Sequence, residues 1–200
     1  MNTTIDKTNA AFALQFKTPP GWVDVVIADF NTFLQDHASC EKKASGMALN
    51  VLAHYPDKPD IVSAMADLAL EELSHFREVL RLLSARNVPP AADRKDPYVN
   101  ALNKYIRRAP ETFLLDRLLV ASIVEKRGYE RFKIIEYALS ESPEQRFYKA
   151  IVASEKRHYQ LFLNLAYHHC ETGTVELRLS ELLTLEAEIV STLPLRAALH

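Results

Sequence analysis

Apolar residues recur at spacings of three and four along several stretches of the chain, which is the period of α-helices that bury one face. Prolines and one glycine punctuate the pattern, and residues 1–20 are expected to form an N-terminal arm. The first long stretch is expected to bend on its way. The predicted helices span about 22–55, 59–87, 97–108, 111–139, 142–170 and, after a break at Gly173, 175–192.

The apolar face of each of the four longest helices is interrupted near its middle by a glutamate. On the second and fourth of these helices a histidine follows three residues later, on the same face. Apolar residues occupy the stripe on both sides of every interruption, so these polar side chains are expected to be buried. They are Glu41, Glu72, His75, Glu125, Glu155 and His158.

Four carboxylates buried together require compensating positive charge. Two divalent metal ions would supply it, and one Glu on two helices with Glu-x-x-His on the other two is the ligand set of ferritin-like dimetal bundles. Oxygen ligands with imidazole favour iron or manganese over metals that prefer thiolates. The pattern therefore predicts a dimetal site held by these six side chains.

The order of the candidate ligands predicts how the helices connect. Glu41 and Glu72 are 31 residues apart, Glu125 and Glu155 are 30 apart, and 53 residues separate Glu72 from Glu125. Two helical hairpins joined by one long connection fit these spacings. We therefore expect an all-α, ferritin-like four-helix bundle with one long crossover and an extra C-terminal helix, in a single domain spanning residues 1–200.

Simpler interpretations exist for each residue taken singly. A helical glutamate is more often a solvated surface charge, and a metal-free helical interaction module would then explain the chain. His37 lies outside the Glu-x-x-His pairs, so we interpret it as a core histidine beside the site rather than a ligand. The coincidence of four interruptions at matching depth favours the dimetal interpretation.

The composition of the chain indicates the cellular compartment in which the protein is expected. Hydrophobic residues make up 48% and charged residues 25%, there are only four glycines, and the net charge is −2. No apolar run approaches the roughly 20 residues of a membrane span, and the first residues lack the pattern of a signal peptide. Cys40 and Cys170 are expected to be reduced thiols, so we expect a cytoplasmic protein without membrane contact.

Short stretches around the candidate ligands resemble one known family, the bacterial tRNA hydroxylases that act on methylthio-isopentenyladenosine beside the anticodon. The resemblance covers about residues 19–170, and in that family the implied metal ligands fall on the same six positions. The stretches are DHASCEKKA (36–44), EELSHFREV (71–79), ARNVP (85–89), IVEKRGYERF (123–132) and SEKRHYQ (154–160).

The resemblance implies an O2-dependent monooxygenase with two carboxylate-bridged iron ions that hydroxylates the isopentenyl group. Its electrons would come from a separate reductase or a ferredoxin, and tRNA would be the substrate. The open alternative is a ferritin-like oxidase or peroxidase acting on a small molecule or on iron. We favour a monomer.

Positions near the candidate ligands predict the substrate pocket and the tRNA contacts. By their place on the helices, the expected pocket residues are Phe33, Ala121, Gly128 and Phe162. Basic pairs directly follow three of the ligand glutamates, as at Lys126–Arg127, and are expected on the solvated surface. Arg107 and Arg108, in the crossover, are the expected contacts to tRNA phosphate.

Overall fold

Seven helices make up most of the protein, and the computed structural model describes residues 11–200. No strand occurs in this range, which confirms the all-α prediction. Residues 1–10 of the predicted N-terminal arm lie outside the described part. The helices are α1 (Gly21–Ala28), α2 (Phe30–His54), α3 (Pro59–Ala85), α4 (Pro97–Asn103), α5 (Pro110–Ala138), α6 (Pro143–His169) and α7 (Thr172–Thr192).

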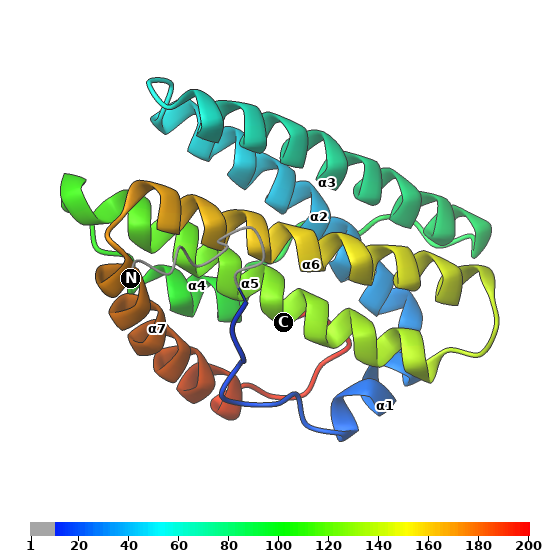
Figure 1. The fold of residues 1–200 in the computed structure, drawn as a ribbon. Helices are drawn as coiled ribbons and strands as arrows, with labels where there is room; N and C mark the ends of the chain where they lie inside the picture. Colours follow the sequence, from blue (N-terminus) through cyan, green and yellow to red (C-terminus); the bar gives the residue numbers. More distant parts are fainter. Residues whose placement is uncertain (1–10) are drawn as a thin grey trace.

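The four longest helices form a bundle of two hairpins (Figure 1). Helix α2 packs along α3, α5 packs along α6, and α3 meets α6 between the hairpins. A long connection containing α4 joins α3 to α5, as predicted. The additional helix α7 packs beside α4 and α5, on the outside of the bundle.

Local capping decides where several helices begin. The first long stretch is two helices, because Asp29 leaves the helical conformation (φ −133°, ψ 60°) and its side chain accepts a hydrogen bond from the Thr32 amide. Ser142 caps α6 in the same way, through the amide of Gln145. The expected bend is thus confirmed and lies at Asp29.

Two predicted boundaries were wrong. The short helix α4 ends at Asn103 rather than near 108, and residues 104–109 connect it to α5. The last helix begins at Thr172, because the Glu171 side chain caps it by accepting a hydrogen bond from the Thr174 amide. Gly173 therefore lies in the first turn of α7 instead of breaking the chain before it.

A layer of polar side chains divides the core of the bundle into two apolar clusters. One cluster includes Met65, Leu118 and Phe162, and the other includes Leu34, Val79 and Ile151. The candidate ligands lie along the same helices between these two sets. The division reproduces in space the interruption of each apolar stripe in the sequence.

Helix α7 is attached to the bundle by a buried ion pair. Arg127 of α5 is fully buried, and its Nη2 donates to Glu186 Oε1 of α7 at 2.7 Å. Nη2 also donates to the backbone oxygen of Phe16 at 2.8 Å. The expectation that Lys126–Arg127 is a solvated pair was therefore wrong for Arg127, because α7 and residues 11–20 cover this side of α5.

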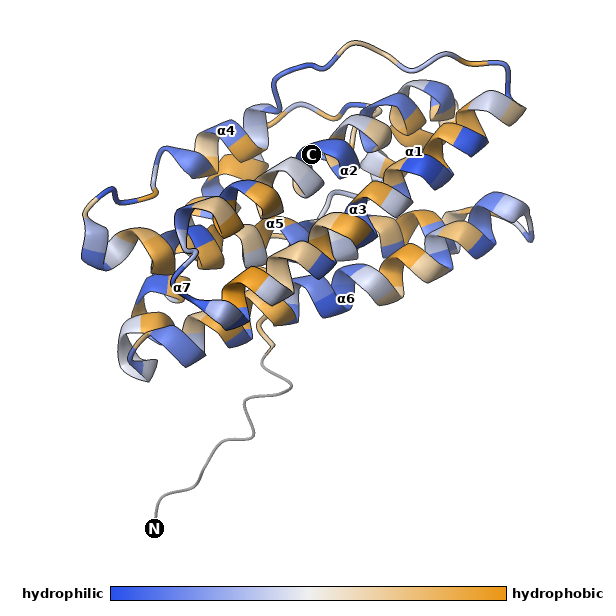
Figure 2. Cartoon of the chain, turned by 90° about the horizontal axis from the view of Figure 1, so that it is seen from above, coloured by the Kyte–Doolittle hydropathy of each residue, from blue (hydrophilic) through white to orange (hydrophobic). Residues whose placement is uncertain are grey.

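The chain after α7 runs back across the molecule to α1 and α2. The Trp22 indole donates to the backbone oxygen of Ala198 at 3.2 Å, and the amide of Leu199 donates to Asp36 at 2.7 Å. Figure 2 shows apolar and hydrophilic residues interleaved along the helices. None of the helices in residues 11–200 is long and apolar enough to cross a membrane.

Candidate metal centre

The six side chains predicted as ligands come together in the middle of the bundle. Glu41 is on α2, Glu72 and His75 on α3, Glu125 on α5, and Glu155 and His158 on α6. The four glutamates are between 1% and 7% exposed, and His158 is 2% exposed. His75 is the most accessible of the six, with 14% of its side chain exposed. The helical register therefore places all six where the sequence predicted.

The six side chains form two overlapping groups, and in each group the potential ligand atoms lie within 4.8 Å of one another. One group contains Glu41 and His75, and the other contains Glu125 and His158. Glu72 and Glu155 belong to both groups, so their carboxylates lie where ligands shared by two ions would be. Four carboxylates also match the charge of two divalent cations. The geometry is compatible with a di-iron centre.

Two buried atoms in this site support the fit to metal ions. Glu72 Oε1 and His158 Nδ1 are buried, and neither has a hydrogen-bond partner within residues 11–200. They lie 3.0 Å apart but are not aligned to hydrogen-bond with each other. Buried polar atoms are rarely left unsatisfied, and a carboxylate oxygen beside the nitrogen of a neutral imidazole is a pair that a cation between them would satisfy.

Without metal the site concentrates negative charge, and the pKa values show it. Burial, then the neighbouring charge of Glu41, raises the pKa of Glu72 to about 7. Burial, then the charge of Glu125, raises the pKa of Glu155 well above its ordinary value. Burial would lower the pKa of His75, but the neighbouring carboxylates of Glu41 and Glu72 outweigh burial and raise the pKa to about 9. Protons thus take the place of metal charge.

His37 holds Glu41 in position, as expected for a histidine beside the site. His37 is fully buried, its Nε2 donates to Glu41 Oε1 at 2.5 Å, and its Nδ1 accepts from the Tyr148 hydroxyl at 3.1 Å in the tautomer that satisfies both bonds. Burial alone would raise the pKa of Glu41, but the interaction with His37 lowers it well below its usual value. Glu41 is therefore kept ionised and oriented.

Glu71 plays the matching part for His158, and the sequence pattern did not reveal it. The Nε2 atom of His158 lies 3.2 Å from Glu71 Oε2, on the opposite side of the ring from Glu72. Ser154 and Arg157 each donate to Glu71 Oε1 at 2.5 Å. Glu71 precedes Glu72 and lies off the apolar stripe, so helical periodicity marks it only as a surface residue.

An apolar cavity of about 290 Å³ leads from the carboxylate layer toward the surface. Its buried end is formed by the four glutamates, and its walls come mainly from α2, α4 and α5. Apolar atoms make up most of the lining surface, which suits a hydrocarbon group. The apolar wall residues are Ala44, Met47, Val99, Ile106, Val120, Ala121, Val124, Phe132 and Leu199.

Two of the four predicted pocket residues line this cavity and two do not. Ala121 and Gly128 are in its wall. Phe33 and Phe162 are fully buried outside it. Phe33 packs against Trp22 and Phe30, and Phe162 belongs to the larger apolar cluster, so both are core residues. The prediction for these two phenylalanines was wrong because one helix face serves both the core and the cavity.

Gly128 makes room for the carboxylate of Glu155, a candidate metal ligand. A Cβ atom at this position would lie 3.2 Å from Glu155 Oε2 and 3.8 Å from the Phe132 ring. Glycine inside a helix costs about 1 kcal/mol relative to alanine. The position next to Glu155 explains why that cost is accepted here.

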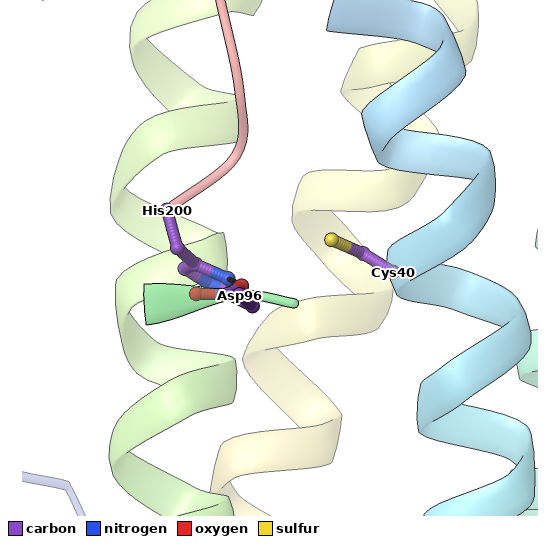
Figure 3. A group of neighbouring side chains, drawn as sticks. All are labelled: Cys40, Asp96 and His200. Carbon is purple, nitrogen blue, oxygen red and sulfur yellow. Dashed lines mark hydrogen bonds and ion pairs between the residues drawn. The ribbon is translucent and has the colours of Figure 1, made fainter. Parts of the chain in front are cut away.

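A thiol, a carboxylate and an imidazole meet beside this cavity, on α2, before α4 and at the end of the chain (Figure 3). The imidazole Nδ1 of His200 lies 2.9 Å from Asp96 Oδ2, and the other oxygen of Asp96 accepts the amides of Tyr98 and Val99. Burial would raise the pKa of Asp96, but His200 and these amides lower it to about 2. The hydrogen bonds of Asp96 are thus complete within the protein, so we interpret this group as cavity wall.

Arg107 is exposed but binds partners within the protein, and its contact to tRNA phosphate stays a prediction. Arg107 Nε and Nη2 donate to the two oxygens of the buried carboxylate of Asp116, at 3.0 and 2.7 Å. Arg178 of α7 binds the same carboxylate. Arg107 therefore fastens the crossover to α5 and α7. Arg108 is exposed, with its guanidinium 5.7 Å from the centre of the Phe113 ring.

Comparison with known proteins identifies relatives over most of the chain. A protein of Pseudomonas putida named tRNA 2-(methylsulfanyl)-N(6)-isopentenyladenosine(37) hydroxylase is 37% identical over 158 residues, 79% of this chain and 77% of the relative. A Salmonella typhimurium protein of the same name is 35% identical over 106 residues, 53% of this chain and 39% of that protein.

A solved structure shares the fold and most of the length. It is described as protein 43 with aldehyde deformylating oxygenase activity from Synechococcus, with a TM-score of 0.87 and 31% identity, covering 94% of this chain and 93% of that one. The sequence model of the family described as tRNA-(MS[2]IO[6]A)-hydroxylase (MiaE) matches residues 5–200. The chain therefore belongs to the tRNA-(MS[2]IO[6]A)-hydroxylase (MiaE) family.

Proposed function

We propose that this chain is an O2-dependent di-iron monooxygenase that hydroxylates the isopentenyl group of 2-methylthio-isopentenyladenosine in tRNA, beside the anticodon. The observation that carries the proposal is the position of the carboxylate and imidazole layer at the buried end of an apolar cavity. The names of the relatives supply the substrate class.

The metal ligands in this proposal are the six residues of the two overlapping groups, Glu41, Glu72, His75, Glu125, Glu155 and His158. When bound, two iron ions would supply the redox chemistry that activates O2, with electrons from a separate reductase or a ferredoxin. His37 and Glu71 orient Glu41 and His158, the role that outer carboxylates and imidazoles serve around metal sites.

The cavity wall supports the choice of substrate group. An isopentenyl chain is apolar, and the wall near the carboxylates consists of small and medium apolar side chains such as Ala121 and Val124. Such a wall would hold a methyl group beside the candidate ligand carboxylates and keep water away from it. The protein's own contribution is therefore positioning and exclusion of water.

The proposal is tested with the iron-loaded full-length protein and tRNA from cells that lack their own hydroxylase. We expect about two irons per chain, and conversion of the methylthio-isopentenyl nucleoside to its hydroxylated form when O2 and a reductant are present. The measurement is mass spectrometry of the digested nucleosides. A chain that binds two irons and consumes reductant but leaves this nucleoside unchanged would refute the substrate assignment.

The structural relative supports a second candidate, an oxygenase acting on a small aliphatic molecule. That relative has aldehyde deformylating oxygenase activity by its description, and the apolar cavity here also suits an alkyl chain. Turnover of a medium-chain aldehyde by the same iron-loaded preparation, without turnover of tRNA, would favour this candidate.

Gel filtration of the iron-loaded protein tests whether it is a monomer, as the sequence analysis expects.

A further inference from the structure

Arg117 is one of the charged residues in the wall of the mainly apolar cavity. It comes from α5, eight residues before Glu125, and the exposed residues Lys43 and Asn103 also line the cavity. The four buried carboxylates line the same cavity. Arg117 thus brings a cationic group to the cavity that contains the candidate metal ligands.

The guanidinium of Arg117 has an unused donor. Its Nη2 donates to Asn50 Oδ1 at 2.8 Å, and the group stacks 5.4 Å from the centre of the Phe113 ring. Its Nη1 is buried and has no hydrogen-bond partner within the described part of the chain. Leaving a buried donor unpaired is costly, so a site that holds one in place is suited to a ligand that supplies the acceptor.

Arg117 has no carboxylate partner within residues 11–200, unlike three other arginines near the crossover. Arg107 and Arg178 share Asp116, and Arg127 pairs with Glu186. Burial, together with the like charge of Arg108, lowers the pKa of Arg117. An anion bound at this position would offset both the burial of the Arg117 charge and its repulsion by Arg108. The planar guanidinium suits the oxygens of a phosphate.

The distance along α5 fits a nucleotide. Arg117 and Glu125 are eight residues apart on one helix, which corresponds to about 12 Å along its axis. A purine with a five-carbon side chain spans a comparable length, and the phosphates lie beyond its sugar. The methylthio-isopentenyl adenine base has no negative charge and no carbonyl oxygen, so phosphate is its nucleotide's best partner for a guanidinium.

We propose that Arg117 binds a phosphate of the nucleotide whose modified base enters the cavity, an inference that rests on the proposed function. The contact would hold the nucleotide at the cavity entrance while its side chain reaches the carboxylate layer. It adds a phosphate contact on α5 to those that the sequence predicts at Arg107 and Arg108. Arg117 is thus a substrate-positioning residue.

The test compares 2-methylthio-isopentenyladenosine with its 3′- and 5′-monophosphates, using calorimetry on the iron-loaded full-length protein under anaerobic conditions. Wild-type protein should bind at least one monophosphate about 10-fold more tightly than the nucleoside. Arg117→Gln should abolish this difference and leave nucleoside affinity unchanged. Arg117→Lys, which keeps the charge but not the planar fork, should retain part of the difference.

Arg77→Gln is the matched control, because Arg77 is exposed on α3 and does not line the cavity. It removes the same charge and should leave the preference for monophosphate intact. Iron content and thermal midpoint establish that each variant is folded. The phosphate assignment would be overturned if Arg117→Gln weakened the binding of nucleoside and monophosphate equally. It would also be overturned if wild-type protein bound the monophosphate no more tightly than the nucleoside.

Binding and turnover separate this inference from the proposed function. If wild-type protein prefers the monophosphate through Arg117 but hydroxylates neither it nor tRNA, the phosphate site stands and the proposed reaction fails. If wild-type protein hydroxylates tRNA and shows no dependence on Arg117, the reaction stands and the phosphate site fails.

Discussion

At the scale of single residues, Gly128 and Glu155 together shape the interior of the candidate metal centre. Gly128 leaves the space that Glu155 occupies, with only 3.2 Å between a hypothetical Cβ and Glu155 Oε2. This contact is tighter than ordinary van der Waals distance, and the backbone of α5 cannot move without disturbing Glu125. The position is therefore constrained by the site more than by helix propensity.

We expect Gly128→Ala to lower iron occupancy and hydroxylation several-fold, because the new methyl group displaces the Glu155 carboxylate. The metal-free variant should not be much less stable than wild type, since alanine gains about 1 kcal/mol of helix propensity. Iron analysis and urea unfolding measure the two effects. Unchanged iron binding would show that Glu155 does not need this space.

Gly46→Ala provides the control for that substitution. Gly46 is exposed on α2, and a Cβ there has no neighbour within 4 Å. The Gly46→Ala substitution should raise the free energy of unfolding by about 0.5–1 kcal/mol and leave iron binding unchanged. A parallel loss of iron in this variant would point to a general effect of stiffening the helices.

At the scale of elements, α7 is attached through charges that lie inside the protein. Arg127 and Glu186 are both fully buried, and the Tyr98 hydroxyl donates to the same Glu186 oxygen at 3.1 Å. Burial raises the pKa of Glu186 despite its partner. Such a pair contributes little net stability while intact, but losing one partner strands a buried charge.

We expect Arg127→Met to destabilise the protein by about 3–5 kcal/mol, because Glu186 would remain buried without its cation. The double variant Arg127→Met with Glu186→Gln should recover most of the loss, since the amide oxygen can still accept from Tyr98. Chemical denaturation measures both changes. A double variant as unstable as the single one would mean that Arg127 acts through packing and its bond to residue 16 instead.

At the scale of the whole molecule, the bundle is built around a layer that favours cations. Four buried carboxylates separate its two apolar clusters, so the metal-free protein must protonate some of them. The raised pKa values of Glu72 and Glu155 express that need. Stability of the fold and occupancy of the centre are therefore linked.

We expect the metal-free protein to lose stability as pH rises from 5 to 8. A carboxyl group whose folded pKa is raised stabilises the fold below its unfolded pKa, and this contribution is lost as pH rises through the folded value. For Glu72, with a pKa of about 7 in the folded state, the loss is on the order of 3 kcal/mol. His75 and His158, with pKa values of about 9 and 10, add to the decline above neutral pH.

Two comparisons make this prediction decisive. The stability of the iron-loaded protein should not fall between pH 5 and 8, because metal ions replace the protons on the carboxylates. Glu155→Leu removes one repelled carboxylate and should make the metal-free protein more stable at pH 8, by about 1–4 kcal/mol, while weakening iron binding. The measurement is the free energy of unfolding in urea of chelator-treated wild type and variant at pH 5 and pH 8. A variant less stable than wild type at pH 8 would contradict the view of Glu155 as a repelled, buried group.

The sequence by itself determined the helices, the bundle and the six positions that meet at its centre. Helical periodicity assigns each residue to a face, so a glutamate on an apolar stripe is predicted to be buried wherever the helix packs. The matching offsets of Glu41, Glu72, Glu125 and Glu155 then placed them at one depth.

Only the tertiary structure decided which charged residues surround that centre and how the cavity is closed. Three residues look like surface charges in the sequence but are not. Glu71 contacts His158, Arg117 lines the cavity, and Arg127 binds α7. His200 reaches Asp96 across 104 residues of chain. Periodicity describes the faces of one helix, whereas these contacts depend on which distant segment covers a face, and that is fixed only when the whole chain packs.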